Sequence, residues 1–299
     1  MKKVIISIPA YNEEKTLGSV LAEIKQVMSK TKYNWKILIV NDGSKDKTAD
    51  VAREQGVIVI NHPRNLGLAE TFRTEMKECL ALGADIIVNT DADGQYRANE
   101  IPLLLSYIDK GYDFVLGSRF MGEIEYMPFM KKFGNKAFSR VISSITKTKI
   151  TDGQTGFRAF TKEVAKNIEI TSTYTYTQEQ IIRAVRQKYK IIEVPAHFDV
   201  RGGKTESRLM KGPFDYAIKA GINLIRVYRD YEPLKFFGRI GMTMILISVL
   251  LGIYLLFNDI IYGNAQLDKM VPTILLGSVF FLSGLQTILF GFLADMQKK

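Results

Sequence analysis

The sequence predicts an α/β protein with a mostly parallel sheet, followed by two membrane-spanning helices. Three observations predict it. Short apolar runs alternate with helical patterns over residues 1–120, acidic side chains follow three of those runs, and two long uncharged stretches lie near the C-terminus. Strands that alternate with helices favour a parallel sheet with helices on both faces. The 299 residues, 46% of them apolar, suffice for one large domain and an appendage.

The first 120 residues contain the expected strands and helices of this sheet. The strands are short apolar runs: Val4–Ile8, Lys36–Val40, Val57–Ile60, Asp85–Asn89 and Phe114–Gly117. The helices are longer segments with apolar residues at helical spacing: Glu13–Lys30, Asp46–Gln55, Leu68–Leu82 and Asn99–Lys110. Because ligands bind outside the carboxyl ends of strands in open α/β sheets, the loops after these strands are expected to form the binding edge.

Two segments, 127–148 and 213–230, have the pattern of basic amphipathic helices. In the first, Met130, Phe133 and Ile142 share a face with further apolar residues, and lysines and an arginine are interleaved. Such a helix can pack on the protein's own core or lie in the membrane interface. We expect the interfacial placement, because spanning helices would already tether the domain to the bilayer.

The C-terminal part predicts a transmembrane hairpin. Residues 240–258 and 270–294 carry no charged side chain. At about 1.5 Å per residue, each stretch can cross a hydrocarbon core of about 30 Å. We place the spans at about 238–258 and 271–293, within a region 235–299 that follows a juxtamembrane helix at 213–234 and the α/β domain at 1–212.

Basic residues flank the two spans and predict the orientation of the chain. Lys235 and Arg239 precede the first span, and Lys298 and Lys299 follow the second. The positive-inside rule then places the α/β domain and both termini in the cytoplasm, at a cell membrane or an endoplasmic-reticulum-type membrane.

The net charge of +10 is compatible with nucleic acid or an anionic membrane surface as a partner. Its concentration on the two amphipathic segments favours the membrane. No nucleic-acid partner is expected, because the sequence has no RNP-like, zinc-finger or helix-turn-helix signature. The single cysteine, Cys79, excludes an internal disulfide and is expected to be a buried apolar residue.

Asp91 and Asp93 follow the fourth expected strand and are the strongest functional signal. Two carboxylates held close together repel each other unless a cation lies between them. Their hard oxygen atoms suit Mg²⁺ or Mn²⁺, which usually share coordination with substrate phosphates. A lone acidic pair of this kind is most often a solvated turn. Here its position after an apolar strand favours a metal site that holds a nucleotide diphosphate.

The first two strands end in residues that could complete a nucleotide site. Tyr11 and Glu13 follow the first strand, and Asp42 follows the second. An aromatic ring could lie against the base, and carboxylates could accept hydrogen bonds from base or ribose. Each fragment alone could be a helix cap or a turn, but their coincidence at three strand ends favours a nucleotide site.

These strand ends, with Gly117–Phe120, Thr151–Arg158 and Arg201–Lys204, resemble those of family 2 glycosyltransferases with a GT-A fold. The last three blocks resemble the dolichyl- and polyprenyl-phosphate sugar synthases in particular, and the resemblance covers about residues 3–212. It implies metal-dependent, inverting transfer of a sugar from a nucleotide sugar to dolichyl or polyprenyl phosphate, giving a β-linked lipid sugar. The substrates would be a nucleotide sugar and a membrane lipid, and the cofactor a divalent metal, Mg²⁺ or Mn²⁺.

The resemblance assigns roles to individual residues. Those implied for the nucleotide sugar are Pro9, Tyr11, Glu13, Asp42, Asp91, Asp93 and Glu179. Those implied for the metal are Asp91, Asp93 and Gln95. Those implied for the acceptor phosphate are Arg119, Lys131, Lys132, Arg201 and Lys204. Those implied for catalysis are Asp93, Asp152 and Arg119.

Asp152 has two possible roles. A carboxylate acts as general base in related inverting enzymes. A phosphate monoester is already anionic near neutral pH, because its second pKa is about 6, and it hardly needs a base. Asp152 could instead orient the sugar hydroxyls or Arg158.

The chain departs from these relatives at two places in the acceptor site. Residues 129–132 read Phe-Met-Lys-Lys where several relatives carry an arginine, and the segment 203–208 is longer than the compact form, so Lys204 or Arg208 could reach the phosphate.

The donor and the exact reaction stay open at this point. The Gln154-containing block favours UDP-glucose or UDP-N-acetylglucosamine, and GDP-mannose remains possible. One alternative is another membrane-bound family 2 enzyme that extends a glycan, but Trp35, the only tryptophan, is not in a QxxRW-type motif. Another is a non-catalytic protein that binds nucleotide sugars, which the intact acidic set disfavours. The oligomeric state is not predicted.

Overall fold

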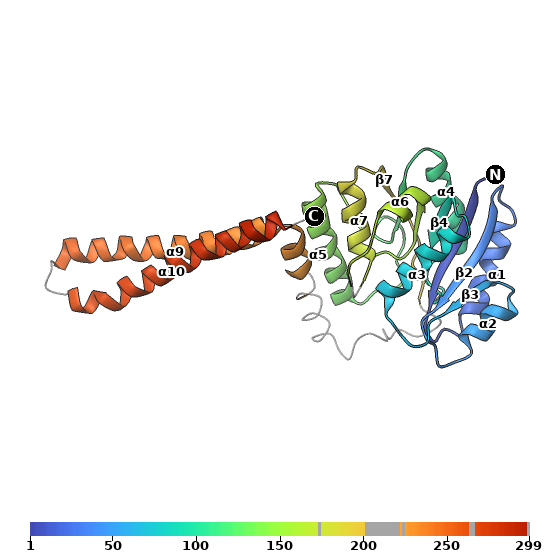
Figure 1. Ribbon diagram of the computed structural model, residues 1–299, viewed down its shortest axis with the longest axis horizontal. Coiled ribbons are helices and arrows are strands. Elements are labelled where there is room, and N and C mark those ends of the chain that lie inside the picture. The colour runs from blue at the N-terminus through green and yellow to red at the C-terminus, as the bar shows by residue number, and fades with distance from the viewer. Residues whose placement is uncertain (173–174, 201–221, 223–224, 263–266, 298–299) are drawn as a thin grey trace. The chain divides into compact units, whose positions relative to one another are not determined.

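The computed structural model describes residues 1–172, 175–200, 222, 225–262 and 267–297 (Figure 1). The chain forms two compact units, Met1–Ala217 and Ile218–Lys299. The expected helix at 213–230 lies mostly outside the described residues, although residues 225–230 are helical.

The first unit is built on a seven-stranded sheet with the order β3-β2-β1-β4-β6-β5-β7. Its strands are β1 (Lys3–Ala10), β2 (Asn34–Asn41), β3 (Ile58–Asn61), β4 (Ile86–Asn89), β5 (Phe114–Ser118), β6 (Arg158–Thr161) and β7 (Ile191–Pro195). All neighbours pair in parallel except β6, which runs antiparallel to both β4 and β5. The expected α/β fold class is confirmed. The sequence patterns identified β1 to β5 but neither β6 nor β7.

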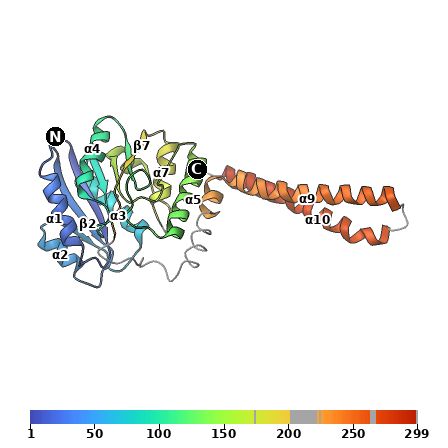
Figure 2. The same cartoon turned by 180° about the vertical axis from the view of Figure 1, so that it is seen from behind.

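Helices cover both faces of this sheet (Figures 1 and 2). They are α1 (Leu17–Met28), α2 (Thr48–Glu54), α3 (Leu68–Ala81), the 3₁₀ turn η1 (Ala98–Glu100), α4 (Ile101–Asp109), α5 (Phe129–Thr146), α6 (Lys162–Asn167) and α7 (Thr177–Arg186). The buried apolar residues of α1 and α4 share one core with β1, β4 and β5. On the other face α3 packs against β1, β2 and α6, and its Phe72 stacks on Tyr176 at the start of α7.

The strand register brings the expected functional loops to one edge of the sheet. Ala10 is level with Asn41 on the neighbouring strand. Asn89, which lies two residues before Asp91, is level with Arg158. Because β6 is antiparallel, it contributes its first residue to this edge, whereas the parallel strands contribute their last. On the neighbouring strands Ser118 is level with Pro195.

Helix α5 divides its apolar residues between the protein core and solvent. Phe138, Ile142 and Ile145 are buried on the first unit's core. Phe129 and Phe133, near the start of the helix, are 78% and 59% exposed. Ile142 therefore packs on the core whereas Met130 and Phe133 are exposed, so these three residues do not share one face. The interfacial placement of the helix stays a prediction.

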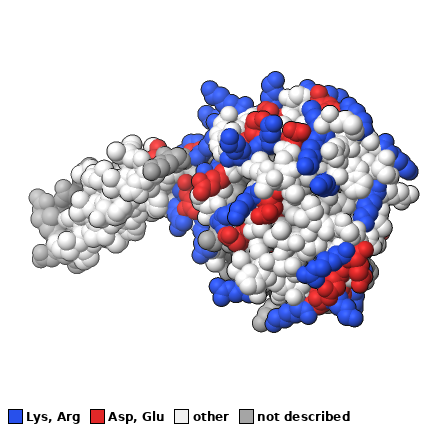
Figure 3. Space-filling model, turned by 45° about the vertical axis from the view of Figure 1, so that its right-hand side comes forward, with Lys and Arg blue, Asp and Glu red and all other residues white. Residues whose placement is uncertain are grey.

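The second unit contains a hairpin of α9 (Pro233–Tyr262) and α10 (Leu267–Met296). Windows within Pro233–Phe257 and Met270–Met296 are long and apolar enough to cross a membrane, and only 6% and 17% of them is buried. Core helices of soluble proteins are mostly buried, so these fractions favour helices that cross a membrane. Figure 3 shows the described hairpin surface as nearly uncharged, whereas both signs of charge gather on the first unit.

Glycines allow the two helices to pack backbone to backbone. A Cβ atom on Gly241 would lie 2.5 Å from the Gly284 carbonyl oxygen, and one on Gly284 would lie 2.7 Å from the Gly241 oxygen. The Ser248 hydroxyl donates a hydrogen bond to the Gly277 carbonyl at 2.8 Å. Small residues and interhelical hydrogen bonds of this kind drive helix association in lipid, where the hydrophobic effect does not.

We predict that Gly284→Leu separates the helices of the hairpin. The new side chain would meet the Gly241 backbone, which cannot move aside as a flexible side chain could. Energy transfer between dyes attached to Gly238→Cys and Met296→Cys should fall. The matched control is Gly252→Leu, because a Cβ atom there has no neighbour within 4 Å. Equal energy transfer in both variants would contradict this packing.

Candidate active site

The acidic loop after β4 is held against the block Thr151–Arg158. A Cβ atom on Gly156 would lie 2.9 Å from Asp91 Oδ1 and 3.0 Å from Oδ2, so the Asp91 carboxylate rests directly on this glycine. Asp93 Oδ1 accepts the Gln95 backbone N–H at 3.1 Å. Between them Gly94 has a φ of +74°, which glycine adopts without strain. The half-buried Asp91 carboxylate is thus held against Gly156, and the half-buried Asp93 carboxylate by the Gln95 backbone N–H.

The donor atoms of this loop fit a hard divalent cation. The Gln95 side-chain N–H donates to the Asp199 carbonyl at 3.0 Å, so the amide oxygen is the Gln95 atom that could serve as a ligand. Within the described ranges no three His, Cys, Asp or Glu side chains form a complete metal-binding group. Mg²⁺ is usually held by one or two carboxylates together with substrate phosphates, so Asp91 and Asp93 match its requirement.

The turn after β1 presents Tyr11 at the same edge, with its side chain 39% exposed. Asn12 has a φ of +55°, and its N–H donates to the Ser44 hydroxyl at 2.9 Å, which ties the turn to the loop after β2. Glu13 is buried and accepts a hydrogen bond from the Thr16 hydroxyl at 3.1 Å. Pro9 is half-buried at the end of β1.

Asp42 is tied to the loop after β3. Its carboxylate accepts hydrogen bonds from the Leu66 and Gly67 N–H groups at 2.8 and 2.9 Å, and lies 2.8 Å from His62 Nδ1. Asp42 therefore positions residues 62–67 beside the strand ends. The sequence did not indicate this function for His62.

Arg119 and Asp152 form a buried bidentate ion pair. Arg119 Nε and Nη2 donate to the two Asp152 carboxylate oxygens at 2.6 and 2.8 Å, and the Arg119 backbone N–H donates to Oδ2 at 3.1 Å. Asp152 is fully buried. Its partner is Arg119, so the expectation that it could orient Arg158 is wrong.

Glu193 on β7 holds the loop that carries Asp152. Its two carboxylate oxygens accept the backbone N–H groups of Thr151 and Asp152 at 2.7 and 2.9 Å. Burial raises the pKa of Glu193 against these hydrogen bonds. Glu193, Asp152 and Arg119 therefore form a chain of contacts from β7 to the end of β5.

Phe198 brings a second cation toward Arg119. The Arg119 guanidinium carbon lies 5.0 Å from the Phe198 ring centre, and Lys131 Nζ lies 5.9 Å from it. Lys132 is exposed on α5. Arg201 and Lys204 lie outside the described residues.

Glu179 has a different environment from the one expected. Its buried carboxylate accepts hydrogen bonds from the Thr171 and Ser172 N–H groups and pairs with Arg183 Nε at 2.8 Å. These contacts engage both oxygens with the chain itself. We therefore assign Glu179 a role in holding residues 171–172.

A buried polar group that was not predicted from the sequence lies beneath the acidic loop. Glu75 on α3 is fully buried and accepts the Ser7 hydroxyl at 2.8 Å and the Asn89 amide at 3.4 Å. Burial, partly offset by the Ser7 hydrogen bond and reinforced by Asp91, raises the pKa of Glu75 to about 8. A glutamate within the otherwise apolar face of an amphipathic helix was the available signal.

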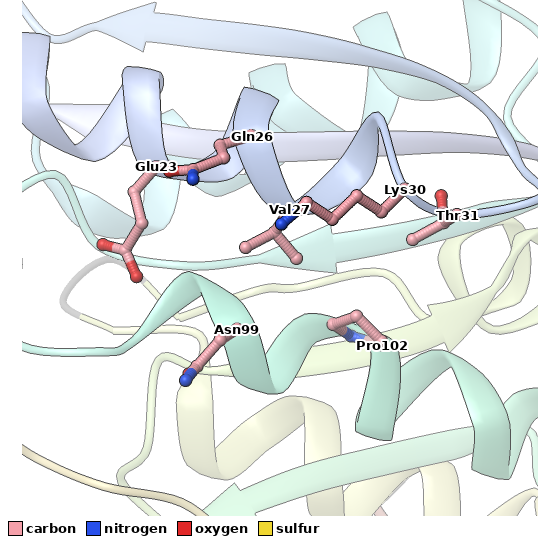
Figure 4. Close-up of a pocket in the computed structure, with 7 residues that line it drawn as sticks. All are labelled: Glu23, Gln26, Val27, Lys30, Thr31, Asn99 and Pro102. Atoms are coloured by element: carbon pink, nitrogen blue, oxygen red, sulfur yellow. The ribbon is translucent and has the colours of Figure 1, made fainter.

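A cavity of about 480 Å³ lies elsewhere, between α1 and the start of α4. Figure 4 shows Glu23 and Gln26 of α1 above Asn99 and Pro102. Its lining includes none of the expected site residues, and it brings together no acidic pair. The strand edge, not this cavity, is the candidate active site.

Comparison with known proteins agrees with the site. The sequence profile described as Glycosyl transferase family 2 matches residues 5–169, which contain both the acidic loop and Arg119. The chain belongs to glycosyl transferase family 2. This confirms the resemblance, and the protein is a glycosyltransferase.

Several relatives of this glycosyltransferase are named for dolichyl phosphate. A dolichyl-phosphate hexose transferase of Haloferax volcanii is 34% identical over 73% of this chain and 90% of its own length. A UDP-N-acetylglucosamine–dolichyl-phosphate N-acetylglucosaminyltransferase of Methanococcus voltae is 33% identical over 65% and 84%. A dolichol-phosphate mannosyltransferase of Pyrococcus furiosus is 30% identical over 82% and 70%.

Solved structures share the fold of this glycosyltransferase at low identity. Mannosyl-3-phosphoglycerate synthase of Rubrobacter xylanophilus aligns with a TM-score of 0.59 and 16% identity, over 76% of this chain and 74% of its own. Glucosyl-3-phosphoglycerate synthase of Mycobacterium tuberculosis, solved with Mn²⁺, UDP and its product, aligns at 0.55 and 16% over 75% and 80%. The expected GT-A fold is confirmed.

We predict that Glu75→Gln removes a pH-dependent loss of stability. Between the unfolded pKa of 4.5 and the folded value of about 8, the folded chain holds a proton that the unfolded chain releases. The free energy of unfolding therefore falls as pH rises through this window. In metal-free buffer, the glutamine variant should gain stability relative to wild type between pH 5 and 8.

Glu78→Gln on the same helix is the matched control and should keep the wild-type pH profile. Thermal unfolding followed by the fluorescence of Trp35, the only tryptophan, measures both variants. Parallel profiles for wild type and Glu75→Gln would contradict the assignment of a neutral Glu75.

We predict that Asp152→Asn lowers the free energy of unfolding by about 3–5 kcal/mol, because it leaves the buried Arg119 without its charge partner. Asp199→Asn is the matched control, since it breaks the Arg97–Asp199 pair, whose side chains are 46% and 27% exposed. Exposed pairs contribute about 1 kcal/mol or less. Denaturant titration compares the free energies of unfolding of the two variants. Equal losses would contradict the larger contribution of the buried pair.

Proposed function

We propose that this glycosyltransferase moves a sugar from a nucleotide sugar to dolichyl or another polyprenyl phosphate. One observation carries the proposal. The block Thr151–Arg158 holds the acidic loop at Gly156 and the buried arginine at Asp152. A group suited to a metal-bound diphosphate and a group suited to a phosphate acceptor are therefore positioned by the same eight-residue segment.

Asp91, Asp93 and the Gln95 amide oxygen would hold Mg²⁺ or Mn²⁺. The metal would neutralise the leaving nucleoside diphosphate as a Lewis acid. The Mycobacterium tuberculosis synthase of the same fold was solved with Mn²⁺ and UDP, which supports a metal-bound diphosphate in this fold. Pro9, Tyr11, Glu13 and Asp42 would bind the nucleoside.

Arg119 would bind the acceptor phosphate, and Asp152 would position it. Nε and Nη2 are engaged by Asp152, so Nη1 is the guanidinium nitrogen that would bind an incoming anion. Lys131 and Lys132 would add positive charge, with Arg201 and Lys204 from outside the described residues. A buried, fully engaged Asp152 is poorly placed to accept a proton, and a phosphate nucleophile does not need it to.

The acceptor phosphate oxygen would attack the anomeric carbon on the side opposite the diphosphate. An α-linked donor would then give a β-linked lipid sugar. The chain contributes orientation and fixed charges, which are the main sources of rate in such a transfer. We favour UDP-glucose or UDP-N-acetylglucosamine as donor over GDP-mannose, because of the Gln154-containing block.

The hairpin would anchor the protein with its catalytic domain, residues 1–212, and both termini on the cytoplasmic side. Flanking basic residues support this orientation. The exposed Phe129 and Phe133 of α5, beside Lys132 and Lys136, suit the membrane interface. The acceptor phosphate could then reach Arg119 while its isoprenoid tail stays in lipid.

We predict that Asp93→Asn lowers lipid-sugar formation at least about 100-fold, because a lost metal ligand removes charge stabilisation that is worth several kcal/mol. Full-length protein would be offered UDP- and GDP-sugars with polyprenyl phosphate and Mg²⁺ or Mn²⁺, and the lipid product identified by mass. Asp85→Asn is the matched control, because Asp85 lies at the opposite end of β4.

Full product formation by Asp93→Asn would overturn the metal-dependent reaction. Absence of a lipid product with every donor and the wild-type protein would overturn the proposed acceptor.

A further inference from the structure

Helix α10 carries a second line of heptad-spaced residues besides its glycines. Gly277, Gly284 and Gly291 recur every seven residues and face α9. A separate set with alternating spacings of four and three residues comprises Leu275, Val279, Leu282, Gln286, Leu289, Leu293 and Met296. We call this set the outer seam.

The outer seam points away from α9. Each glycine lies midway between two seam residues, as Gly284 lies two positions from both Leu282 and Gln286. Two residues turn an α-helix by about 200°, so the seam lies on the opposite side from the glycine contact. In agreement, every apolar seam residue is more than half exposed, from 53% at Leu289 to 82% at Met296.

Gln286 is the central member of the seam and its only polar side chain. It is exposed, and three apolar seam residues lie on either side of it. At about 1.5 Å per residue the seam ends lie about 15 Å away, so Gln286 would sit near the middle of a bilayer about 30 Å thick. An amide without a hydrogen-bond partner is costly there.

We propose that the outer seam pairs with the same seam of a second copy of this chain, joined at Gln286. The proposal rests on the membrane placement of the hairpin in the proposed function. A carboxamide carries both donors and an acceptor, so two copies of Gln286 can satisfy each other. Copies with one orientation in the membrane pair about an axis along the membrane normal, which brings their α10 helices parallel and Gln286 to the same depth.

The heptad residues would give this pair its geometry. Residues at alternating spacings of four and three interlock as knobs and holes between parallel helices, and a single polar residue in such a seam fixes the register. Leucine side chains gain little free energy by exchanging lipid contacts for contacts with one another. A hydrogen bond between the helices favours their association.

Cysteine crosslinking in membranes isolated from expressing cells tests the pair. The one native cysteine, Cys79, is buried, so disulfide-linked dimers would form through the introduced cysteines. Disulfide-linked dimers of the full-length protein should form at the seam variants Val279→Cys, Leu282→Cys and Leu293→Cys, at least several-fold more than at the off-seam variants Leu276→Cys and Leu285→Cys.

Substitution of Gln286 tests the hydrogen bond. In the Leu282→Cys background, Gln286→Leu should lower the crosslinked fraction several-fold, and Gln286→Asn should retain most of it. The matched control is Thr287→Val, whose hydroxyl donates only within its own helix, to the Ser283 carbonyl. It should crosslink like the parent.

The outcomes separate this inference from the proposed function. Equal crosslinking on and off the seam, or an unchanged fraction in Gln286→Leu, overturns the pairing even when the protein resists carbonate extraction and forms lipid sugar. Release of the protein by carbonate overturns the membrane placement, and loss of product from intact membranes overturns the transfer reaction.

Discussion

The ion pair between Arg119 and Asp152 is the contact on which the arrangement of the site depends. Two buried charges are tolerated only when each is the other's partner and the remaining polar atoms are satisfied. Here the Asp152 oxygens take three hydrogen bonds from Arg119, and Glu193 holds the loop from behind. The ends of β5 and β7 and the block before β6 are consequently locked to one another, and the acidic loop is then positioned against the same block.

The site separates charge along the sheet edge. Carboxylates gather after β1, β2 and β4, whereas the guanidinium after β5 and the lysines of α5 lie beyond β6. Burial raises the pKa of Glu75, which lies beneath the acidic loop on α3, to about 8 and so favours its neutral form at pH 7. Asp91 and Asp93 then supply the negative charge of this part of the edge.

The sequence patterns anticipated the first half of the domain better than the second. Strands β1 to β5 are apolar runs, and their polar ends follow directly, so both the strands and the acidic side chains at this edge could be predicted. Strand β6 begins with the buried Arg158, which is stabilised by the carbonyls of Thr155 and Thr177, and no local pattern reports such partners. Glu193 and Glu179 likewise acquire their roles from distant backbone N–H groups. The periodicity of α5 suggested one apolar face, but tertiary packing selected another.

The linked contacts of Arg119, Asp152 and Glu193 have a consequence for the stage of synthesis at which the site can be completed. The acidic loop and the turns after β1 and β2 follow strands that are made first. Arg119 can pair with Asp152 only after a further 33 residues have been made, and Asp152 can be held by Glu193 only after another 41 residues. A ribosome-bound chain that ends before β7 would thus contain Arg119 and Asp152 but not Glu193, so the loop that carries Asp152 would lack the carboxylate that holds it.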